Sequence, residues 1–376
     1  MDAKLSIRSF QKSDLEELDI LIKEYWYSDH IFLHSRKLLE WQYKGYGLKR
    51  GFHFPLLLFE NEMIGCKGII PSELRIPVDN TIKIEPLAVG ALFLVKPKFR
   101  GQKLGLLLHQ YAKKKYSNFL SIAANLKTSA PIYRKSGYFI MDEMLRYILP
   151  LNDDYANLLI TSCDDYRPYI FESNCDVENP LNFTSTEMSD FYLKSIGEKM
   201  ILSMNKSREF WQWRYLDNPV YKYQFFGGKG KGGLIVARVC KLYNDKKLRD
   251  ETILRILELL PENPDVWDGI RDIKLNQLLK GVFKWAQQKK CAGVDFYSTT
   301  HCFAPTLESI GMKEINEQSE YKNLDIFSYF EPTTTNKRLC NVCISLSDSK
   351  LNVDFDKTYF TLADSDQDRP NILSNE

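Results

Sequence analysis

The sequence predicts an α/β protein built from two similar domains in tandem. Its length of 376 residues suits two domains of ordinary size. Some apolar stretches alternate with the two-residue period of strands, and others follow the spacing of helices. The same order of elements also occurs twice along the chain, so the prediction of two domains rests on a duplication.

The first repeated element predicts a helix followed by a β-hairpin. In the first half it contains Trp41 and Tyr43, within "LLEWQYKGYGLKRGFHFPLLLFENEMIGCKGII". In the second half it contains Trp213 and Tyr215, within "EFWQWRYLDNPVYKYQFFGGKGKGGLIVARVC". Each copy follows a helix-like stretch and precedes two apolar runs that a short polar turn separates.

The next element of the first half predicts a strand, a short loop and a helix. "AVGALFLV" alternates like a strand, whereas leucines from Leu104 to Leu108 recur at helical spacing. The N–H groups of a first helical turn lack partners and can bind a phosphate, and Arg100 and Lys103 add positive charge. The glycine-containing loop is therefore either an anion site or ordinary turn chemistry.

A strand end, Ala-Pro, a helical turn and a glycine then recur, as "LKTSAPIYRKSGYF" and "STTHCFAPTLESIGM". We predict a first domain over residues 1–150, a connector over 151–180, a second domain over 181–348 and a tail over 349–376. The connector is assigned because "LNDDYANLLITSCDDYRPY" is polar and poorly periodic.

The overall charge and composition single out no class of partner. The 51 basic and 49 acidic side chains leave a net charge of +2, which favours neither nucleic acid nor a membrane surface. The N-terminus lacks the pattern of a signal peptide and no stretch is apolar enough to span a bilayer, so we predict a cytoplasmic protein. The oligomeric state stays open.

The cysteines predict neither disulfides nor a metal site. Most of the eight lie inside apolar strings, as reduced core residues do. Cys340 and Cys343 have CxxC spacing, but the nearby Cys291 and Cys302 do not form a second such pair. An alternating strand, "LCNVCISLS", explains the spacing more simply than zinc, and we predict no metal.

Two motifs of the first half, "VKPKFRGQKLG" from Val95 to Gly105 and "NLKTSAPIYRKSGY" from Asn125 to Tyr138, resemble those of the GNAT superfamily of CoA-dependent acyltransferases. The resemblance implies two GNAT-like domains, each a mixed, mostly antiparallel sheet flanked by helices. It implies acyl-CoA as co-substrate, its pyrophosphate on the loop amides and its pantetheine arm along the preceding strand end. The implied CoA-binding residues are Phe93, Leu94, Val95, Arg100, Gly101, Gln102, Lys103, Leu104, Gly105, Asn125 and Tyr133.

Lys103 and Asn125, two residues of these motifs, each have two interpretations. Lys103 stands where the family usually has a glycine, so its side chain either crowds the pyrophosphate or points outward as a charge partner. Asn125 matches a position that hydrogen-bonds the pantetheine arm, although an asparagine after a strand is also a routine turn residue.

The second half has no such loop. At the corresponding place, "LELLPENPDVWDGIRDIKLNQLLKG" carries Glu258, Glu262, Asp265 and Asp268, which would repel a diphosphate. One CoA per chain is therefore expected. The tandem arrangement, the duplicated W-x-Y elements and the closing "TLADSDQDRP" resemble bacterial nucleotide-sugar N-acyltransferases. This narrower resemblance implies acylation of the amine of a dTDP-linked aminodideoxy sugar, in surface-polysaccharide (O-antigen) biosynthesis.

Acyl transfer from a thioester to an amine needs a neutral amine, a stabilised oxyanion and a proton for the leaving thiolate. Tyr133 matches the tyrosine that family members place near the CoA sulfur as a general acid, and the alternative is that it packs on its helix. The oxyanion would be met by a backbone N–H near a strand bulge around Phe93 and Leu94.

A histidine near neutrality is a candidate general base. His30 borders the expected acceptor cleft and is our candidate, with His34 beside it as an acceptor-binding residue. A sugar amine that loses its proton to water would need no base. His109, in the helix after the loop, is predicted to be a surface or packing residue.

The acceptor site has its candidates in Trp41 and in the tail. An aromatic ring can stack on a base or a sugar, although the duplication of Trp41 in Trp213 favours core packing. An acidic tail is usually solvated. The carboxylates of this tail could instead hold an amine or sugar hydroxyls, and its arginine could reach a phosphate. The candidates in the tail are Asp364, Asp366, Asp368 and Arg369.

Three other functions compete with this prediction. Transfer of an aminoacyl group from tRNA has no use for a CoA loop. An acetyltransferase for an aminoglycoside or a protein would share the CoA motifs and differ in its acceptor cleft. A non-catalytic GNAT pair would bind no CoA.

Overall fold

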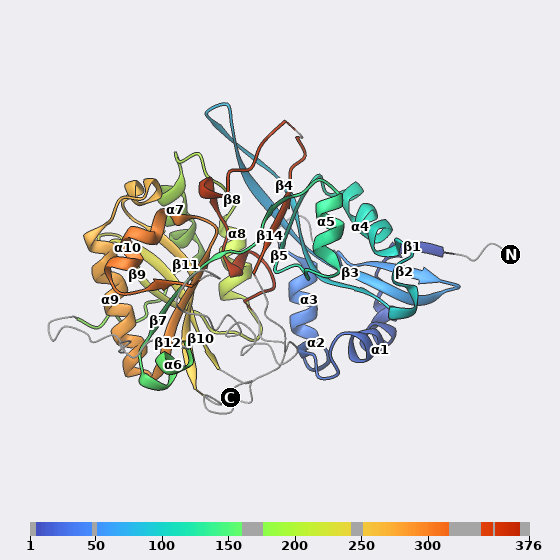
Figure 1. Ribbon diagram of the computed structural model, residues 1–376, viewed down its shortest axis with the longest axis horizontal. Helices are drawn as coiled ribbons and strands as arrows, with labels where there is room; N and C mark the ends of the chain where they lie inside the picture. The colour runs from blue at the N-terminus through green and yellow to red at the C-terminus, as the bar shows by residue number, and fades with distance from the viewer. Residues whose placement is uncertain are drawn as a thin grey trace.

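The computed structural model has two β-sheets that lie side by side, each covered by helices (Figure 1). It describes residues 5–46, 51–159, 176–241, 251–315, 340–348 and 350–368. Both sheets combine parallel with antiparallel pairs, so the predicted class of two mixed sheets flanked by helices is confirmed.

The described elements of the first half follow the predicted order of helix, hairpin, strand, loop and helix. They are β1 (Leu5–Ser9), α1 (Leu15–Tyr25), α2 (Ile31–His34), α3 (Arg36–Lys44), β2 (Pro55–Phe59), β3 (Glu62–Val78), β4 (Thr81–Val95), α4 (Leu104–Lys115), β5 (Asn118–Ile122), α5 (Ser129–Lys135), β6 (Phe139–Met141) and β7 (Leu145–Pro150).

The second half repeats this order after the helices α6 (Asp153–Leu159) and α7 (Ser185–Ile196). Its further elements are β8 (Leu202–Met204), α8 (Arg208–Trp211), a π-helical turn (Gln212–Leu216), β9 (Gln224–Gly228), β10 (Gly233–Lys241), β11 (Thr252–Pro261), α9 (Ile273–Gln288), β12 (Cys291–Ser298), α10 (Ala304–Ser309), β13 (Lys313–Glu314), β14 (Val342–Ser345) and β15 (Thr358–Tyr359).

The two sheets have equivalent topologies. The first has the order β1-β2-β3-β4-β5-β14-β6, with β8 beside β3 and β15 beside β8, and the second has the order β9-β10-β11-β12-β7-β13. In each, the corresponding inner pair is parallel, β4 with β5 and β11 with β12, and the first sheet has a further parallel pair, β8 with β15. The repeat in the sequence is therefore a repeat of structure.

The two halves exchange their last strands. β7 lies between β12 and β13 of the second sheet, and β14 lies between β5 and β6 of the first. This differs from the predicted division at residue 150, because residues 145–150 complete the second sheet and residues 342–345 complete the first. A strand that joins the sheet of the other half has the same apolar alternation as a strand in the sheet of its own half. The sequence pattern therefore does not reveal the exchange.

The duplicated tryptophans meet where the halves join. The Trp41 and Trp213 rings stack with centroids 4.8 Å apart and planes 18° apart. Trp41 Nε1 donates to the carbonyl of Trp213 (2.9 Å), and Trp213 Nε1 donates to the carbonyl of Trp41 (3.1 Å). The predicted packing role of the repeat is thus a reciprocal contact between its two copies.

The long β3–β4 hairpin is a second connection between the halves. β3 pairs with β8 from the second half, and Arg75 of β3 is buried against the C-terminal end of α7. Its guanidinium donates to the carbonyls of Ile196, Gly197, Lys199 and Ile201. One guanidinium therefore satisfies a helix end that would otherwise bury unpaired carbonyls.

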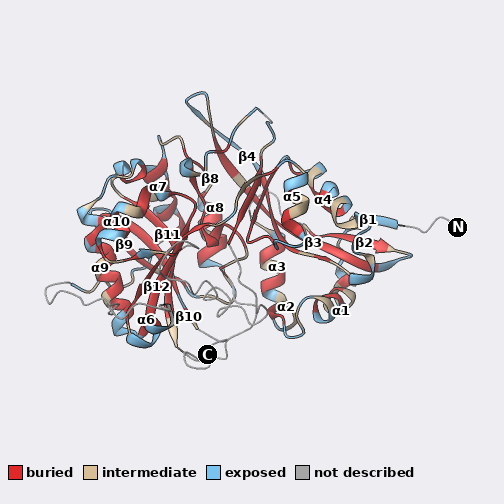
Figure 2. Ribbon diagram, viewed as in Figure 1, coloured by how far each residue is buried: buried red, intermediate tan, exposed pale blue. Residues whose placement is uncertain are grey.

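One apolar core runs through both halves. Buried residues follow the strands of each sheet and continue between them (Figure 2). The tail, which lies outside the repeat, joins this core: β15 pairs with β8, and the short helix Leu362–Asp364 is buried.

We expect Trp41→Ala to lower the free energy of unfolding by about 2–4 kcal/mol, because it removes a stacked indole and its hydrogen bond at the junction. Urea unfolding followed by circular dichroism measures this. The matched control is Trp26→Ala at an exposed indole outside the junction, with an expected change within about 1 kcal/mol. Equal losses in the two variants would contradict the structural role of the stack.

Candidate active site

The loop after β4 leads into the N-terminus of α4 and is exposed. Gly101 has a φ of +81°, and Lys103, the N-cap of α4, has a φ of +60°. This left-handed region is unfavourable for a residue with a Cβ, which explains why a glycine is usual at such a position. Lys103 keeps the turn of the motif and leaves its side chain exposed at the start of the helix.

This loop can present backbone amides to an anion. The first N–H groups of α4 lack partners within the helix, and the helix dipole adds positive potential. Arg100 Nε donates to the carbonyl of Val95 (2.9 Å) and so ties the loop to the end of β4. Gln102 Nε2 donates to the carbonyl of Lys98 (3.4 Å). The turn is thus held by its own side chains.

β4 and β5 form a fork in the first sheet. They pair only over residues 87–89 and 118–120, whereas β4 continues to Val95. Asn341, which precedes β14, pairs with Ala124 and holds the other arm of the fork. Because β4 has no partner strand among the described residues on this side beyond Val89, an extended ligand could pair with its edge.

A β-bulge lies on β4 within the fork. Lys67 pairs with Phe93 and Gly68 with Ala91, so Leu92 is the extra residue, with a φ of +24°. The predicted bulge around Phe93 and Leu94 is therefore centred on Leu92. A bulge releases backbone N–H groups from the strand ladder, as an oxyanion site requires.

Tyr133 lies where the strands part. A Cβ built on Gly90 would be 3.5 Å from the Tyr133 hydroxyl oxygen. A Cβ built on Gly105 would be 3.4 Å from Ile132 and 3.5 Å from Phe93, so the start of α4 meets both α5 and the bulge. The structure thus brings together the loop, the strand end and Tyr133, which the sequence places far apart.

The Tyr133 hydroxyl is kept protonated by its surroundings. Burial raises the pKa of Tyr133 above its ordinary value, and the nearby Asp366 adds to the increase. Lys67 Nζ donates a hydrogen bond to the Tyr133 oxygen (3.2 Å), and Ser121 also hydrogen-bonds this hydroxyl. A protonated hydroxyl can act as an acid and not as a base.

Lys67 and His109 are the residues that the sequence reasoning missed. Both are fully buried, and Lys67 Nζ lies 3.0 Å from His109 Nδ1. His109 Nε2 lies 2.9 Å from the Tyr138 hydroxyl, which completes the chain Tyr133, Lys67, His109, Tyr138. Of the two roles predicted for His109, surface or packing, the structure shows packing. The available signal was a lysine inside the apolar strand "MIGCKGII".

The second half has acidic groups at the equivalent places. Asp272 caps α9, with its side chain accepting from the amide of Leu275 (2.7 Å). Glu262 accepts from the amides of Gly230 and Gly232. Because carboxylates occupy the helix start and the adjoining turn, this end offers no place for a phosphate, in keeping with one CoA per chain.

Two of the acidic tail residues are internal ion-pair partners. Asp364 is buried and lies 3.1 Å from Lys206 Nζ, which also binds Glu258 (2.5 Å). Asp368 is held by Arg214 (3.2 Å) and Arg238 (3.0 Å). The expectation that Asp364 or Asp368 holds an acceptor is therefore corrected: both charges are already neutralised inside the second half.

The pKa values of these two carboxyls follow their surroundings. Burial raises the pKa of Asp364 to about 6, against the opposing effect of Lys206. Burial alone would also raise the pKa of Asp368, but Arg238 and Arg214 lower it below its ordinary value.

Asp366 differs from its neighbours. It is half-buried, and its Oδ1 accepts from Gln367 Nε2 (2.9 Å). Its negative charge contributes to the raised pKa of Tyr133. The buried side chains of Asp364 and Asp368 fix the backbone on either side.

No protein-family model matches the chain, and no curated protein is similar to it in sequence. Solved structures are similar in fold. A GCN5-related N-acetyltransferase from Anabaena variabilis is 13% identical, with a TM-score of 0.55 over 92% of this chain and 73% of that one. Saccharomyces cerevisiae N-myristoyltransferase, with bound myristoyl-CoA, is 10% identical, with a TM-score of 0.56 over 96% and 88%. An Enterococcus faecalis protein of unknown function, a probable N-acyltransferase, is 10% identical, with a TM-score of 0.56 over 92% and 73%.

The chain has the GNAT N-acyltransferase fold. The match to the yeast enzyme spans most of both chains, so it includes both halves of this one. At 10–13% identity the likeness concerns the fold alone.

Within this GNAT fold, His30 has a structural role. It is fully buried, and its Nδ1 accepts from the amide of Phe32 at the start of α2 (3.2 Å). Phe32 contacts Tyr43, which packs on Gly68, whereas the preceding residue Lys67 faces Tyr133. Successive residues of a strand point to opposite faces, so the sheet separates His30 from Tyr133.

The arrangement of His30 argues against the predicted base. A neutral imidazole has one acceptor nitrogen, and here that nitrogen caps a helix. His34 is exposed on α2, and its Nε2 pairs with Asp29.

The remaining predicted residues have local roles. Asn125 is exposed, and its side chain accepts from the amides of Lys127 (2.9 Å) and Thr128 (3.1 Å), as a turn residue does. Trp41 has one face covered by Trp213. Arg369 lies outside the described residues.

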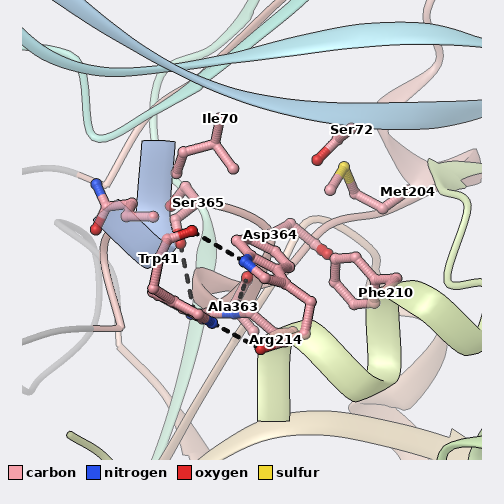
Figure 3. Close-up of a pocket in the computed structure, with 11 residues that line it drawn as sticks. Trp41, Ile70, Ser72, Met204, Phe210, Arg214, Ala363, Asp364 and Ser365 are labelled. Carbon is pink, nitrogen blue, oxygen red and sulfur yellow. Dashed lines mark hydrogen bonds between the residues drawn. The ribbon is translucent and has the colours of Figure 1, made fainter. Parts of the chain in front are cut away.

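A small cavity lies beside the two tryptophans, and Figure 3 shows Trp41, Arg214 and Asp364 around it. Its volume of about 10 Å³ holds about one water molecule, so it does not admit a substrate. An open groove of about 370 Å³ adjoins the same tryptophans and is also lined by Lys37, Glu40 and Lys44.

Among the described residues, no cluster of three or more His, Cys, Asp or Glu side chains is arranged to hold a metal. Cys343 lies in β14, as the alternating pattern predicts, and both Cys340 and Cys343 are buried. No helix in the described ranges is long and apolar enough to cross a bilayer.

We expect Asp368→Asn to lower the free energy of unfolding by about 3–5 kcal/mol, because it leaves two buried guanidinium groups without their carboxylate. Asp366→Asn, two residues away and outside this ion-pair network, is the control and should change stability by about 1 kcal/mol or less. Urea unfolding of both variants at neutral pH measures the difference. Similar stabilities would contradict the assignment of Asp368 as an internal partner.

Proposed function

We propose that the chain is an acyl-CoA-dependent N-acyltransferase that binds one CoA in its first half. The observation that carries the proposal is the convergence of an anion-binding helix start, an open strand edge with a bulge, and a buried tyrosine. An extended thioester with a diphosphate at one end needs these three features in this order. The GNAT fold of the chain supports the same conclusion.

The proposed residues divide between the parts of the coenzyme. Loop residues Arg100 to Gly105 would hold the pyrophosphate, and the strand end Phe93 to Val95 would pair with the pantetheine arm. Asn125 would border the arm from the facing turn. Tyr133 would lie at the sulfur.

The reaction is direct attack of the acceptor amine on the thioester carbonyl carbon. A C–N bond forms, the C–S bond breaks, and the bonding pair leaves on sulfur. Tyr133 gives its proton to that sulfur, and the bulge amides stabilise the oxyanion. The amine nitrogen loses one proton, to Asp366 or to water, and Tyr133 regains one from solvent, so the products are an amide and CoA thiol.

For the acceptor we propose the amine of a dTDP-linked aminodideoxy sugar. The groove beside Trp41 and Trp213 has an aromatic wall that suits a base, and Lys37 at its edge suits a diphosphate. Lys44 also lines the groove and pairs there with Glu40 (2.5 Å). The adjoining tail residue Ser365 lines the small cavity that shares both tryptophans, so Asp366 is one residue from this region. A carboxylate there suits a protonated sugar amine.

The experiment is a thermal-shift comparison of the protein alone, with CoA, with dTDP and with both, since a ligand of the folded state raises its stability. Shifts from both ligands support the proposal. A shift with CoA but not with dTDP supports an acyltransferase and contradicts a nucleotide-sugar acceptor. No shift with CoA refutes the catalytic function and leaves a non-catalytic GNAT pair.

A second stage would follow thiol release from acyl-CoAs of increasing length, from acetyl-CoA to myristoyl-CoA. The acceptors would be a dTDP-amino sugar, an aminoglycoside and a peptide with a free N-terminal amine. If release of the CoA thiol requires the peptide or the aminoglycoside, that amine is the acceptor and the dTDP-amino sugar is not.

We expect Lys103→Glu to weaken CoA binding about tenfold or more at low ionic strength, because it places a negative charge at the start of α4. Isothermal titration calorimetry measures the affinity. Lys114→Glu makes the same change of charge at an exposed position in the last turn of α4, and should change it by no more than about twofold. Equal effects would indicate attraction by overall charge and not a phosphate site.

We expect Tyr133→Phe to lower kcat about 100-fold, with little change in the KM for acyl-CoA, because the thiolate loses its proton donor. Thiol release with the amine selected above measures both constants. Tyr111→Phe, at an exposed tyrosine of α4, should leave both unchanged. Wild-type kcat in Tyr133→Phe would contradict the general-acid role.

A further inference from the structure

Lys67 is a fully buried lysine without an ion pair among the described residues. Its Nζ contacts an imidazole, a hydroxyl and three aromatic rings: His109, Tyr133, and the rings of Phe93 (4.1 Å), Phe119 (4.7 Å) and Tyr133 (5.0 Å). Burial lowers the pKa of Lys67 well below its ordinary value. A buried amine of this kind costs stability, so its presence calls for a reason beyond packing.

The second half shows that the fold does not need this lysine. Its bulge pairs Val236 with Glu258 and Ala237 with Ile256, so Val236 has the strand position that Lys67 has in the first half. The fold therefore accepts an apolar side chain at this position.

The whole network is absent from the second half. Matching the two Ala-Pro helices places Leu307 at the position of Tyr133 and Met312 at that of Tyr138. Counting from the N-caps of α4 and α9 places Leu278 at the position of His109. Four polar residues in the half with the phosphate loop thus correspond to four apolar residues in the half without it.

We propose that Lys67 is the positioning residue for Tyr133: it holds the phenol oxygen as an acceptor, so that the phenol proton points into the fork toward the CoA sulfur. This inference rests on the proposed function. It names a further residue of the same site.

The hydrogen-bond directions carry the argument. Lys67 Nζ donates to the Tyr133 oxygen (3.2 Å). With its oxygen accepting from the lysine, the hydroxyl has its own proton to donate to another partner. Gly90 lies beside the hydroxyl: a Cβ there would be 3.5 Å from the Tyr133 oxygen and 2.7 Å from the ring of Phe119.

Lys67 also counteracts the cost of using a buried acid. When Tyr133 gives its proton to sulfur, negative charge develops on an oxygen that water does not reach. An N–H donor already in place stabilises that charge without reorganisation. His109 adjoins Lys67 in turn, with its Nδ1 3.0 Å from Lys67 Nζ. Burial, together with the nearby Lys67, lowers the pKa of His109 to about 2, so the imidazole beside the lysine stays neutral.

The test compares the binding of CoA with that of desulfo-CoA, which lacks the sulfur, by calorimetry at about pH 8. The wild-type chain should bind CoA about tenfold more tightly, because Tyr133 donates to the thiolate. Lys67→Met and Tyr133→Phe should each reduce this ratio to about one. The combined variant should reduce it no further, since both changes remove the same interaction.

Tyr138→Phe is the matched control. It breaks a buried hydrogen bond at the other end of the network and leaves the Lys67 to Tyr133 contact in place. Tyr138→Phe is expected to keep the wild-type ratio of CoA affinity to desulfo-CoA affinity. If Lys67→Met does not fold, Lys67→Met with His109→Leu replaces it, because the second change removes the imidazole nitrogen left without a donor.

If Lys67→Met or Tyr133→Phe keeps the wild-type ratio of CoA affinity to desulfo-CoA affinity, the inference is overturned. Loss of the ratio in Tyr138→Phe as well also overturns it, by assigning the effect to general disruption of the core. A wild-type chain that binds neither CoA nor desulfo-CoA refutes the proposed function itself, so the two failures are distinguishable.

Discussion

Each sheet of this chain depends on a strand from the other half. The edges of β5 and β12 carry unpaired N–H and C=O groups, and β14 and β7 satisfy them across the junction. The exchange has a consequence for the candidate site, because Cys343 of β14 pairs with Ser121, whose hydroxyl reaches Tyr133. A site that appears to belong to the first half is therefore built on a strand from the second.

Duplication gave the chain two similar forks with opposite electrostatics. The first has a cationic loop, free amides at a helix start and a neutral polar network at its bulge. The second has Asp272 at the helix start and Glu258 at the bulge, where Lys206 and two tyrosine hydroxyls hold it. Carboxylates of the chain thus occupy the region where a diphosphate would bind, so the second copy contributes scaffold and tail instead of a second coenzyme site.

The parts of the structure that the sequence predicts are those set by local patterns. The repeat, the hairpins, the strand–loop–helix unit around Arg100 and the helix of Tyr133 follow from periodicity and turn chemistry. Partners distant in sequence do not: Asp368 meets Arg214 and Arg238, so an acidic run that resembles a solvated tail is buried. Lys67 was missed because a lysine in a strand usually faces water, and only the apolar residues around it indicate otherwise.

The tail links the two copies. Asp364 and Asp368 are fixed inside the second half, and Asp366 lies midway between them in the sequence. Burying two paired carboxylates is costly, and neither contributes much net stability. Their effect is on position: with the backbone fixed on both sides, Asp366 would lose little further entropy if it bound an amine as we propose. Under the proposed function, the second half would supply the acceptor side of a site whose donor side lies in the first.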